Sequence, residues 1–447
     1  MAEKITLISK KASLWIFIGL LAYMPLHIFL STWLGTSFGV LDFAKVAKDG
    51  VLVVGFLLAL GASVRQKWFK PLLRDKLLWL ILAYAALTIF LAIVKPTDQD
   101  AEILGVVYNT RFLLFFLYGG LLVHLFPHKK LRWMALRTVL AAGMVVILFG
   151  IFQYLVLPDN ALSHVGYSRA NGVLPAFFID EKPDLERAMS TLRDPNSLGS
   201  YLIIVGMVAA SVLFATKNRR RESQLIFYLL LTAACLWLSF SRSALLGFML
   251  ASVVFVFLSE DRLMHVMRKH RKPIALITAT AAVVVLGGLF LARDSYLVQN
   301  VVLHSDQHTV LEDPNQLRLH FWKESVFAIV LQPEGTGPGT AGLASIKNDK
   351  QGTVLNENYY LQIAEEVGVI GFLLFMAILV VVARRLYRQH NSQLAIALFA
   401  GFVGLAFTNF LVHIWSNEAV AYTWWGLAGL VLAGKHVKVK SQVNEGK

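Results

Sequence analysis

The chain alternates between long apolar runs and short polar segments. A helix crosses the hydrocarbon core of a bilayer with about 20 apolar residues. On that measure the pattern predicts an all-α polytopic membrane protein with about twelve transmembrane helices. The expected spans are 13–34, 49–63, 77–94, 103–126, 133–157, 197–215, 224–240, 243–259, 274–291, 357–383, 394–413 and 418–434.

The basic residues give these spans a direction. They gather in seven short clusters, and all seven fall on the same side of a twelve-span arrangement. Excess Lys and Arg mark the cytoplasmic side of a membrane protein, so we expect both termini to be cytoplasmic. The clusters are Lys10/Lys11, 65–76, 128–132, 217–221, 268–272, 383–388 and 435–440.

Two long polar segments lie on the opposite, outer side, at 158–196 and 292–356. The second is a large loop between the ninth and tenth spans. Long loops tend to carry function. With no internal repeat visible, residues 1–440 are expected to form a single integral-membrane domain, followed by a polar cytoplasmic tail at 441–447.

Composition agrees with this topology. The chain of 447 residues is 57% hydrophobic and 16% charged, whereas soluble proteins carry about 25% charged residues. The net charge of +14 would suggest nucleic acid in a soluble protein, but here it follows the positive-inside pattern. The one cysteine, Cys235, lies in an apolar run, so no disulfide framework or cysteine metal site is expected.

Once the spans are oriented, polar residues that are far apart in the sequence gather at the outer side. Three arginines lie at or near the outer ends of spans four, six and eight, namely Arg111, Arg193 and Arg242. Arg318 and His320 belong to the second long loop, and His413 lies in the outer turn before span twelve. Polar groups at membrane depth are costly and usually have a function.

The segment NENYYLQIAEEVGVIG (356–371) enters the membrane from the same side. Its residues Asn358, Gln362, Glu365 and Glu366 form one stripe on a helix. Such a stripe must face protein or a wet cavity rather than lipid. The following Gly368 and Gly371 are expected to let a neighbouring helix approach closely.

Structural interpretations stay open for each of these residues. Arg111 could pair with a carboxylate of a neighbouring helix. Arg242 and His413 could be helix-end residues that reach toward the interface. Glu365 and Glu366 could be structural hydrogen-bonding groups, and we expect a cation as their partner. The glycine-rich segment 333–343 could cradle phosphate, but without a Walker lysine this indication is weak.

Several arginines beside one carboxylate suit a diphosphate substrate. Arginine gives permanently charged, bidentate contacts to phosphate oxygens, and a carboxylate suits a general base. The outer loops show no paired acidic motif and no His/Cys cluster, so neither a metal nor another cofactor is expected. A substrate on this face must arrive activated and membrane-anchored, and a polyprenyl diphosphate fits.

These residues resemble the bacterial O-antigen ligase/polymerase group of membrane glycosyltransferases, over roughly residues 190–375. SFSRSALLG (239–247) looks like the Ser-Arg-small turn of the group, and 315–340 resembles its Arg, Trp and Pro-Gly segment. The ligases carry a His-Asn pair, nine further residues and Gly-x-x-Gly. Here Glu357-Asn358 and Gly368-Val369-Ile370-Gly371 have that spacing, with glutamate in place of histidine.

The resemblance implies a metal-independent, inverting transfer on the outer face of the bacterial cytoplasmic (inner) membrane. The donor would be a glycan on undecaprenyl diphosphate, and the acceptor a hydroxyl of a glycan or of a lipid-linked molecule. Glu357 and Arg318 would be catalytic. The substrate-binding residues would be Arg242, Arg193, Arg111, Asn358, Gln362, His320 and His413.

Three functions follow from these observations. Glutamate at position 357 favours a surface-polysaccharide polymerase over a ligase. An O-antigen ligase that transfers the glycan to lipid A-core or another acceptor would use the same chemistry. A transporter or flippase is the third possibility, although transporters tend to show internal repeats and midplane ionisable groups on broken helices.

Overall fold

The computed structural model describes residues 2–66, 73–179, 185–259, 314–350 and 352–433. These residues are all-helical: they contain two isolated β-bridges but no named strand. The α-helices are α1 (Ala2–Tyr23), α2 (His27–Ser37), α3 (Leu41–Arg65), α5 (Lys76–Val94), α6 (Gln99–Leu125), α7 (His128–Val156), α8 (Pro195–Ala215), α9 (Arg219–Leu238), α10 (Arg242–Leu258), α12 (Pro314–Leu331), α13 (Tyr359–Tyr387), α14 (Gln393–Thr408) and α15 (Glu418–Leu432).

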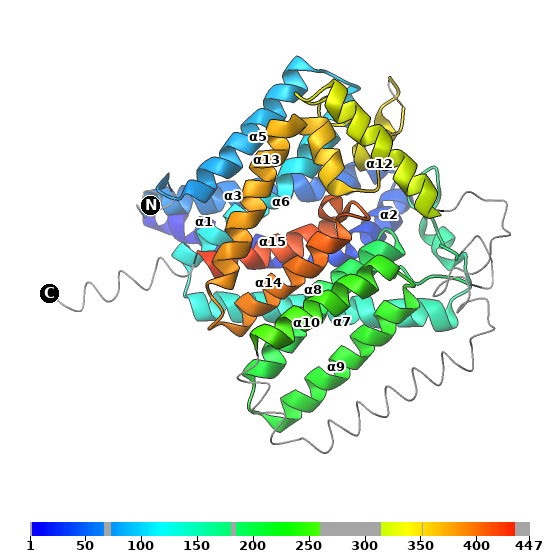
Figure 1. Ribbon diagram of the computed structural model, residues 1–447. Helices are drawn as coiled ribbons and strands as arrows, with labels where there is room; N and C mark the ends of the chain where they lie inside the picture. Colours follow the sequence, from blue (N-terminus) through cyan, green and yellow to red (C-terminus); the bar gives the residue numbers. More distant parts are fainter. Residues whose placement is uncertain (1, 67–72, 180–184, 260–313, 351, 434–447) are drawn as a thin grey trace.

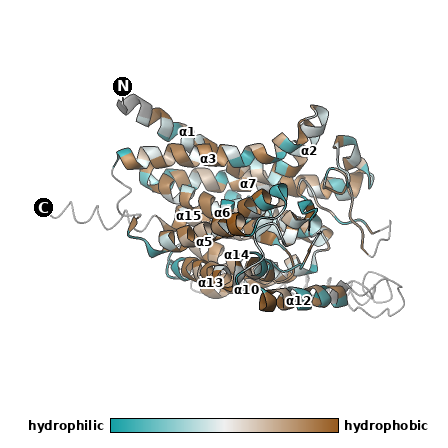
Figure 2. Cartoon of the chain, turned by 90° about the horizontal axis from the view of Figure 1, so that it is seen from above, coloured by the Kyte–Doolittle hydropathy of each residue, from teal (hydrophilic) through white to brown (hydrophobic). Residues whose placement is uncertain are grey.

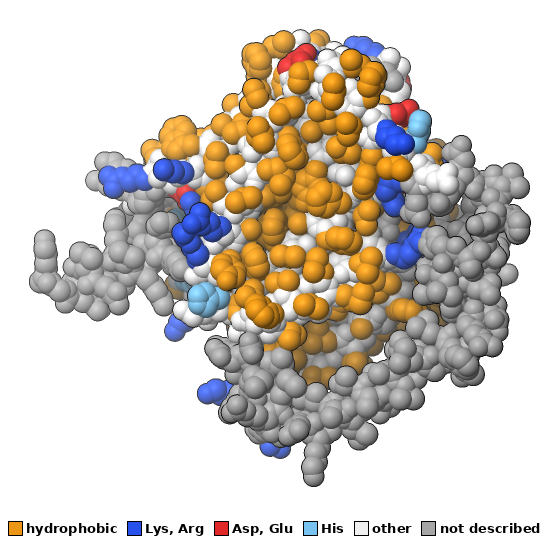
Figure 3. Space-filling model, viewed as in Figure 1, with side chains coloured by type: hydrophobic (Ala, Val, Ile, Leu, Met, Phe, Trp, Pro, Cys, Tyr) orange, Lys and Arg blue, Asp and Glu red, His pale blue; other side chains and the backbone are white. Residues whose placement is uncertain are grey.

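The helices identify an integral membrane protein. Among the described residues, six segments are long and apolar enough to cross a bilayer, and α10 and α14 are shorter apolar helices. Hydrophobic side chains cover the middle of the face in Figure 3, while Lys and Arg lie toward its edges. These segments support the all-α prediction but do not settle the number twelve, and the expected span 274–291 lies outside the described residues.

Three predicted elements take a different form. The first span is divided into α1 and α2 by a 3-10 turn at Met24–Leu26, because Pro25 interrupts helical hydrogen bonding. Helix α13 has a kink at Gly368, which adopts φ +73° and ψ 176°. The segment 292–356, predicted to be an outer loop, contains a helix, α12, which packs on α13.

Helices α6 and α15 pack extensively against each other in the core. A Cβ on Gly429 of α15 would collide with the backbone carbonyl of Phe116 in α6, so this crossing depends on a residue without a side chain. Beside it, the indoles of Trp415, Trp424 and Trp425 pack against one another with ring centroids 5.0–5.6 Å apart. This rigid pair supports the polar residues at its end.

The start of α1 and the end of α15 lie at the same end of the bundle (Figure 1). The polar segments that begin α8, α13 and α15 lie toward the opposite end. Helix α12 runs along the edge of the bundle (Figure 2), and its second half exposes Phe327, Val330 and Leu331. The candidate site is therefore built at one end of the helices, beside an apolar peripheral helix.

Candidate active site

A cavity of about 190 Å³ opens where the starts of α8 and α13 meet the turn between α14 and α15. Both polar and charged groups line it. They include Arg193 from the segment before α8, Glu357 from the segment before α13, and His413 from the α14–α15 turn. The full lining is Tyr108, Arg193, Asp194, Asn196, Ser197, Leu343, Leu355, Glu357, Val412, His413, Ile414, Ser416, Asn417 and Glu418.

Glu357 forms an ion pair with Arg318 of α12. The Nε and Nη2 atoms of Arg318 lie 2.9 and 2.8 Å from Oε2 of Glu357. The two side chains are 27% and 45% exposed. Glu357 has φ +43°, a conformation uncommon for residues other than glycine. The pair therefore sits at an accessible point where the chain turns sharply into α13.

The next residue, Asn358, caps α13. Its Oδ1 accepts hydrogen bonds from the backbone N–H groups of Tyr360 and Leu361, which is the usual task of asparagine at a helix start. Gln362 is fully buried and donates to Glu366, at 3.4 Å. Neither residue lines the cavity, so both are placed to hold the framework behind it.

The glycine-rich segment 333–343 wraps around a carboxylate. Glu366 is fully buried, and its Oε1 accepts from the backbone N–H groups of Gly339 and Ala341 at 2.8 and 3.3 Å. Its Oε2 accepts from Asn109 of α6 at 2.7 Å. The segment thus uses its N–H groups on an internal anion, and the partners of Glu366 are amides rather than the cation that the sequence suggested.

Gly368 has a specific part in this arrangement. A Cβ there would lie 2.5 Å from the carbonyl carbon of Glu334 and 2.8 Å from the nitrogen of Gly335. The glycine therefore admits the loop, and not a neighbouring helix as the sequence suggested. A Cβ on Gly371 would meet the Val367 side chain one turn earlier in α13.

Asn196 at the start of α8 joins two segments that carry arginines. The Oδ1 atom of Asn196 accepts from Arg187 at 3.2 Å and from Ser241 at 2.9 Å. Ser241 directly precedes the exposed Arg242 at the start of α10. Arg193, three residues before Asn196, donates to the carbonyl of Gly172 at 3.5 Å. The SFSRS turn is thus joined through Ser241 to Asn196 in the cavity wall, and Arg193 lines the cavity whereas Arg242 does not.

Arg187 was not singled out from the sequence. It lies in a polar segment among several other charged residues, and nothing in its spacing distinguishes it. Its position becomes apparent only when the chain folds back, since Arg187 also donates to the carbonyl of Ser239, 52 residues later.

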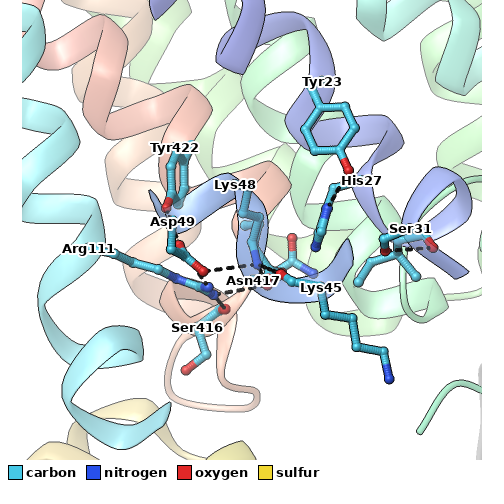
Figure 4. Close-up of polar contacts among 12 residues, drawn as sticks. Tyr23, His27, Ser31, Lys45, Lys48, Asp49, Arg111, Ser416, Asn417 and Tyr422 are labelled. Carbon is cyan, nitrogen blue, oxygen red and sulfur yellow. Dashed lines mark hydrogen bonds and ion pairs between the residues drawn. The ribbon is translucent and has the colours of Figure 1, made fainter. Parts of the chain in front are cut away.

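Arg111 lies in a buried ionic cluster (Figure 4), one member of which, Glu418, also lines the cavity. Its guanidinium is 3.1 Å from Glu418 and 3.7 Å from Asp49, and it donates to the carbonyl of Ser416 at 2.7 Å. Lys48 lies 3.2 Å from Asp49 and 3.5 Å from Glu418. Two cations and two carboxylates thus balance one another, which is the pairing that was left open for Arg111.

His413 is hydrogen-bonded to the segment that precedes α13. Its Nε2 lies 2.8 Å from Oδ1 of Asn356, whose Nδ2 donates to Glu365 at 3.2 Å. Burial, together with the nearby Arg193, lowers the pKa of His413 to about 4. The ring is therefore neutral near pH 7.

His320 lies apart from these groups. Its Nε2 is 3.1 Å from Glu324 one turn later in α12, and the two side chains are 63% and 62% exposed. It does not line the cavity. No cluster of three or more His, Cys, Asp or Glu side chains suited to a metal ion occurs within the described part of the chain.

Comparison with known proteins bears on this site. Residues 227–376 match the family model of the O-antigen ligase. The match covers about a third of the chain and includes Arg242, Arg318 and Glu357, whereas Arg193 and His413 lie outside it. No curated protein matches the chain. The resemblance seen in the sequence is thereby confirmed: the segment 227–376 of this integral membrane protein matches the O-antigen ligase family.

Proposed function

We propose that the protein is a surface-polysaccharide polymerase that transfers an undecaprenyl-diphosphate-linked glycan to a hydroxyl group of an acceptor glycan. The observation that carries the proposal is the Arg318–Glu357 ion pair, which lies where Glu357 enters a cavity also lined by Arg193 and His413. The family match supports glycan transfer. Donor, acceptor and mechanism are our inference.

The arginines would bind the diphosphate of the donor. A guanidinium forms bidentate, permanently charged contacts with phosphate oxygens. Arg193 lines the cavity, and Arg242 follows Ser241, which donates to the lining residue Asn196. Arg318 would exchange Glu357 for the diphosphate when the donor binds, and this exchange would free the Glu357 carboxylate to accept a proton.

The reaction then balances as a single displacement. The acceptor oxygen forms a bond to the anomeric carbon as its proton passes to Glu357. The bond from that carbon to the phosphate oxygen breaks on the opposite side, so the configuration inverts. Its electron pair leaves with undecaprenyl diphosphate. Arginines fixed beside the departing diphosphate would stabilise the charge that develops there.

The remaining residues would keep this geometry rather than touch the donor. Arg111 is occupied by Glu418 and Asp49, Asn358 by the cap of α13, and Gln362 by Glu366. We propose that they form the framework of the site. His320 is placed on the exposed side of α12, with Glu324 as its partner.

We further propose that the site faces outward from the cytoplasmic membrane, with both termini in the cytoplasm. The basic clusters support this orientation, because they lie at the ends of the helices remote from Glu357 in a twelve-span arrangement. The reaction needs no metal ion in this scheme, since the arginines supply the positive charge.

Purified protein, lipid-diphosphate glycan and a gel readout of chain length test the proposal. Chain growth that is insensitive to a chelator is the expected result. Transfer of the glycan only when lipid A-core is supplied as acceptor would indicate a ligase instead. Movement of the glycan across vesicle membranes without a new glycosidic bond would identify a transporter and reject both enzymes.

A further inference from the structure

Three side chains form a hydrogen-bonded line from the buried start of α13 to the cavity. Glu365 is 6% exposed and Asn356 is 1% exposed. The Nδ2 atom of Asn356 donates to Oε2 of Glu365 at 3.2 Å, and Oδ1 of Asn356 lies 2.8 Å from Nε2 of His413. His413 is the member that lines the cavity.

This order of groups determines where the ring proton lies. The carboxyl oxygen of Glu365 accepts the hydrogen bond from Asn356, so the NH₂ group of Asn356 faces Glu365. The amide oxygen of Asn356 then faces His413 and can only accept. The ring must donate through Nε2, and a neutral ring with its proton on Nε2 carries a lone pair on Nδ1.

The line is joined directly to the ion pair of the site. Asn356, which holds His413, is followed by Glu357, which holds Arg318. Consecutive residues thus contact two different groups: His413, which lines the cavity, and Arg318, which pairs with the lining residue Glu357. Glu357 provides a carboxylate that can receive a proton, whereas the neutral ring of His413 provides a hydrogen-bond acceptor.

We propose that His413 presents Nδ1 to a hydroxyl group of the acceptor sugar next to the one that reacts, and that Asn356 and Glu365 fix the ring in this tautomer. The inference rests on the proposed glycan transfer and deepens it. In this proposal His413 orients the acceptor sugar and does not bind the donor diphosphate.

Glutamine at position 413 separates this role from a structural one. The side-chain amide of glutamine places an N–H near the position of Nε2, so His413→Gln keeps a donor to Asn356 but lacks an acceptor at the position of Nδ1. We expect the KM for the acceptor to rise roughly tenfold, because about one neutral hydrogen bond to the acceptor is lost. The KM for the donor should stay unchanged.

The assay uses full-length protein with the lipid-diphosphate glycan as donor. The acceptor probe is the oligosaccharide released from the same glycan by mild acid. His390→Gln, an exposed position after α13, is the matched control and should behave as wild type. An unchanged acceptor KM in an active His413→Gln protein would overturn the role of His413 but leave the proposed function in place. Wild-type protein that forms no glycosidic bond would overturn the proposed function.

The tautomer is tested without any substrate. In protein labelled with ¹⁵N-histidine, the ring signals lost in His413→Gln identify His413. We expect a protonated Nε2 and an unprotonated Nδ1 near pH 7, and a mixture of tautomers in Glu365→Gln, because glutamine can either donate to or accept from Asn356. A proton on Nδ1 in the wild type would refute the proposed orientation of the ring.

Discussion

Arg318 holds a single oxygen of Glu357: its Nε and Nη2 both point to Oε2, at 2.9 and 2.8 Å. The guanidinium fork is therefore not matched by two carboxylate oxygens, and both side chains are partly exposed. Ion pairs of this kind contribute about 0–1 kcal/mol to stability. The pair can open at small cost, which suits groups that must exchange partners during a reaction.

The first prediction concerns the carboxylate. Glu357→Gln preserves the shape of the side chain but removes its basicity, so transfer should fall by roughly 100- to 10,000-fold without loss of folded protein. Glu357→His should retain more activity than Glu357→Gln, because the related ligases carry histidine at this position. Chain length on gels provides the measurement. Wild-type chain growth in the glutamine variant would refute a catalytic role.

The second prediction concerns the guanidinium. Arg318→Lys keeps the charge but loses the fork, so it should reduce activity clearly, and Arg318→Ala should reduce it further. Both variants should remain folded, since Arg318 is partly exposed. Arg220→Lys, on the surface of the basic start of α9, serves as a control with no expected effect. Normal polymerisation by both Arg318 variants at wild-type protein levels would remove Arg318 from the site.

Gly368 gives a prediction about stability. Alanine at this position would adopt the left-handed φ of +73° and collide with the Glu334 carbonyl group. Backbone strain alone costs about 1–3 kcal/mol, so we expect a lower unfolding temperature in detergent. Gly61→Ala, where a Cβ meets nothing within 4 Å, is the matched control. Equal unfolding temperatures of Gly368→Ala and Gly61→Ala would show that the loop at Glu334–Gly335 can move aside freely.

Removing one member of the buried ionic cluster should be more damaging. Arg111→Met leaves Asp49 and Glu418 with Lys48 as their remaining cation of the cluster, and breaking a buried pair typically costs 3–5 kcal/mol. Tryptophan fluorescence during thermal unfolding measures the effect, with the exposed substitution Arg220→Met for comparison. A variant as stable as the control would mean that the cluster is well hydrated.

The orientation of the chain can be tested with single cysteines. Asp159→Cys and Lys347→Cys, both at exposed positions, should react with a membrane-impermeant thiol reagent in cells whose outer barrier, if present, is permeabilised. Arg219→Cys should react only after lysis. The natural Cys235 is buried and should contribute little background. Labelling of Arg219→Cys in intact cells would reverse the topology.

Hydrophobic pattern was sufficient to predict the helical membrane fold, because about 20 apolar residues have few alternatives to a spanning helix. It could not show the break at Gly368, since a glycine in an apolar run is compatible with a continuous helix. The reason for the break lies elsewhere in the sequence: the loop at Glu334–Gly335 occupies the space that a side chain would need.

The site was predicted in part for a similar reason. Arg193, Glu357 and His413 line one cavity, as their common position at the outer ends of the spans suggested. Arg111 and Gln362 are also polar and lie at similar positions, yet they face internal partners. Sequence spacing predicts at which end of a helix a polar residue lies. Whether that residue faces the cavity or an internal partner depends on the neighbouring helices.

The contacts of the Glu366 carboxylate can form only late in translation of the chain. Its partner Asn109 lies 257 residues earlier in the chain, and at about 5–20 residues per second the ribosome takes on the order of tens of seconds to bridge that interval. Until Glu366 has been made, the N–H groups of Gly339 and Ala341 lack the anion that organises their loop. Most of the helices that precede Glu366 in the chain have therefore been synthesised before the contacts that support the candidate site can form.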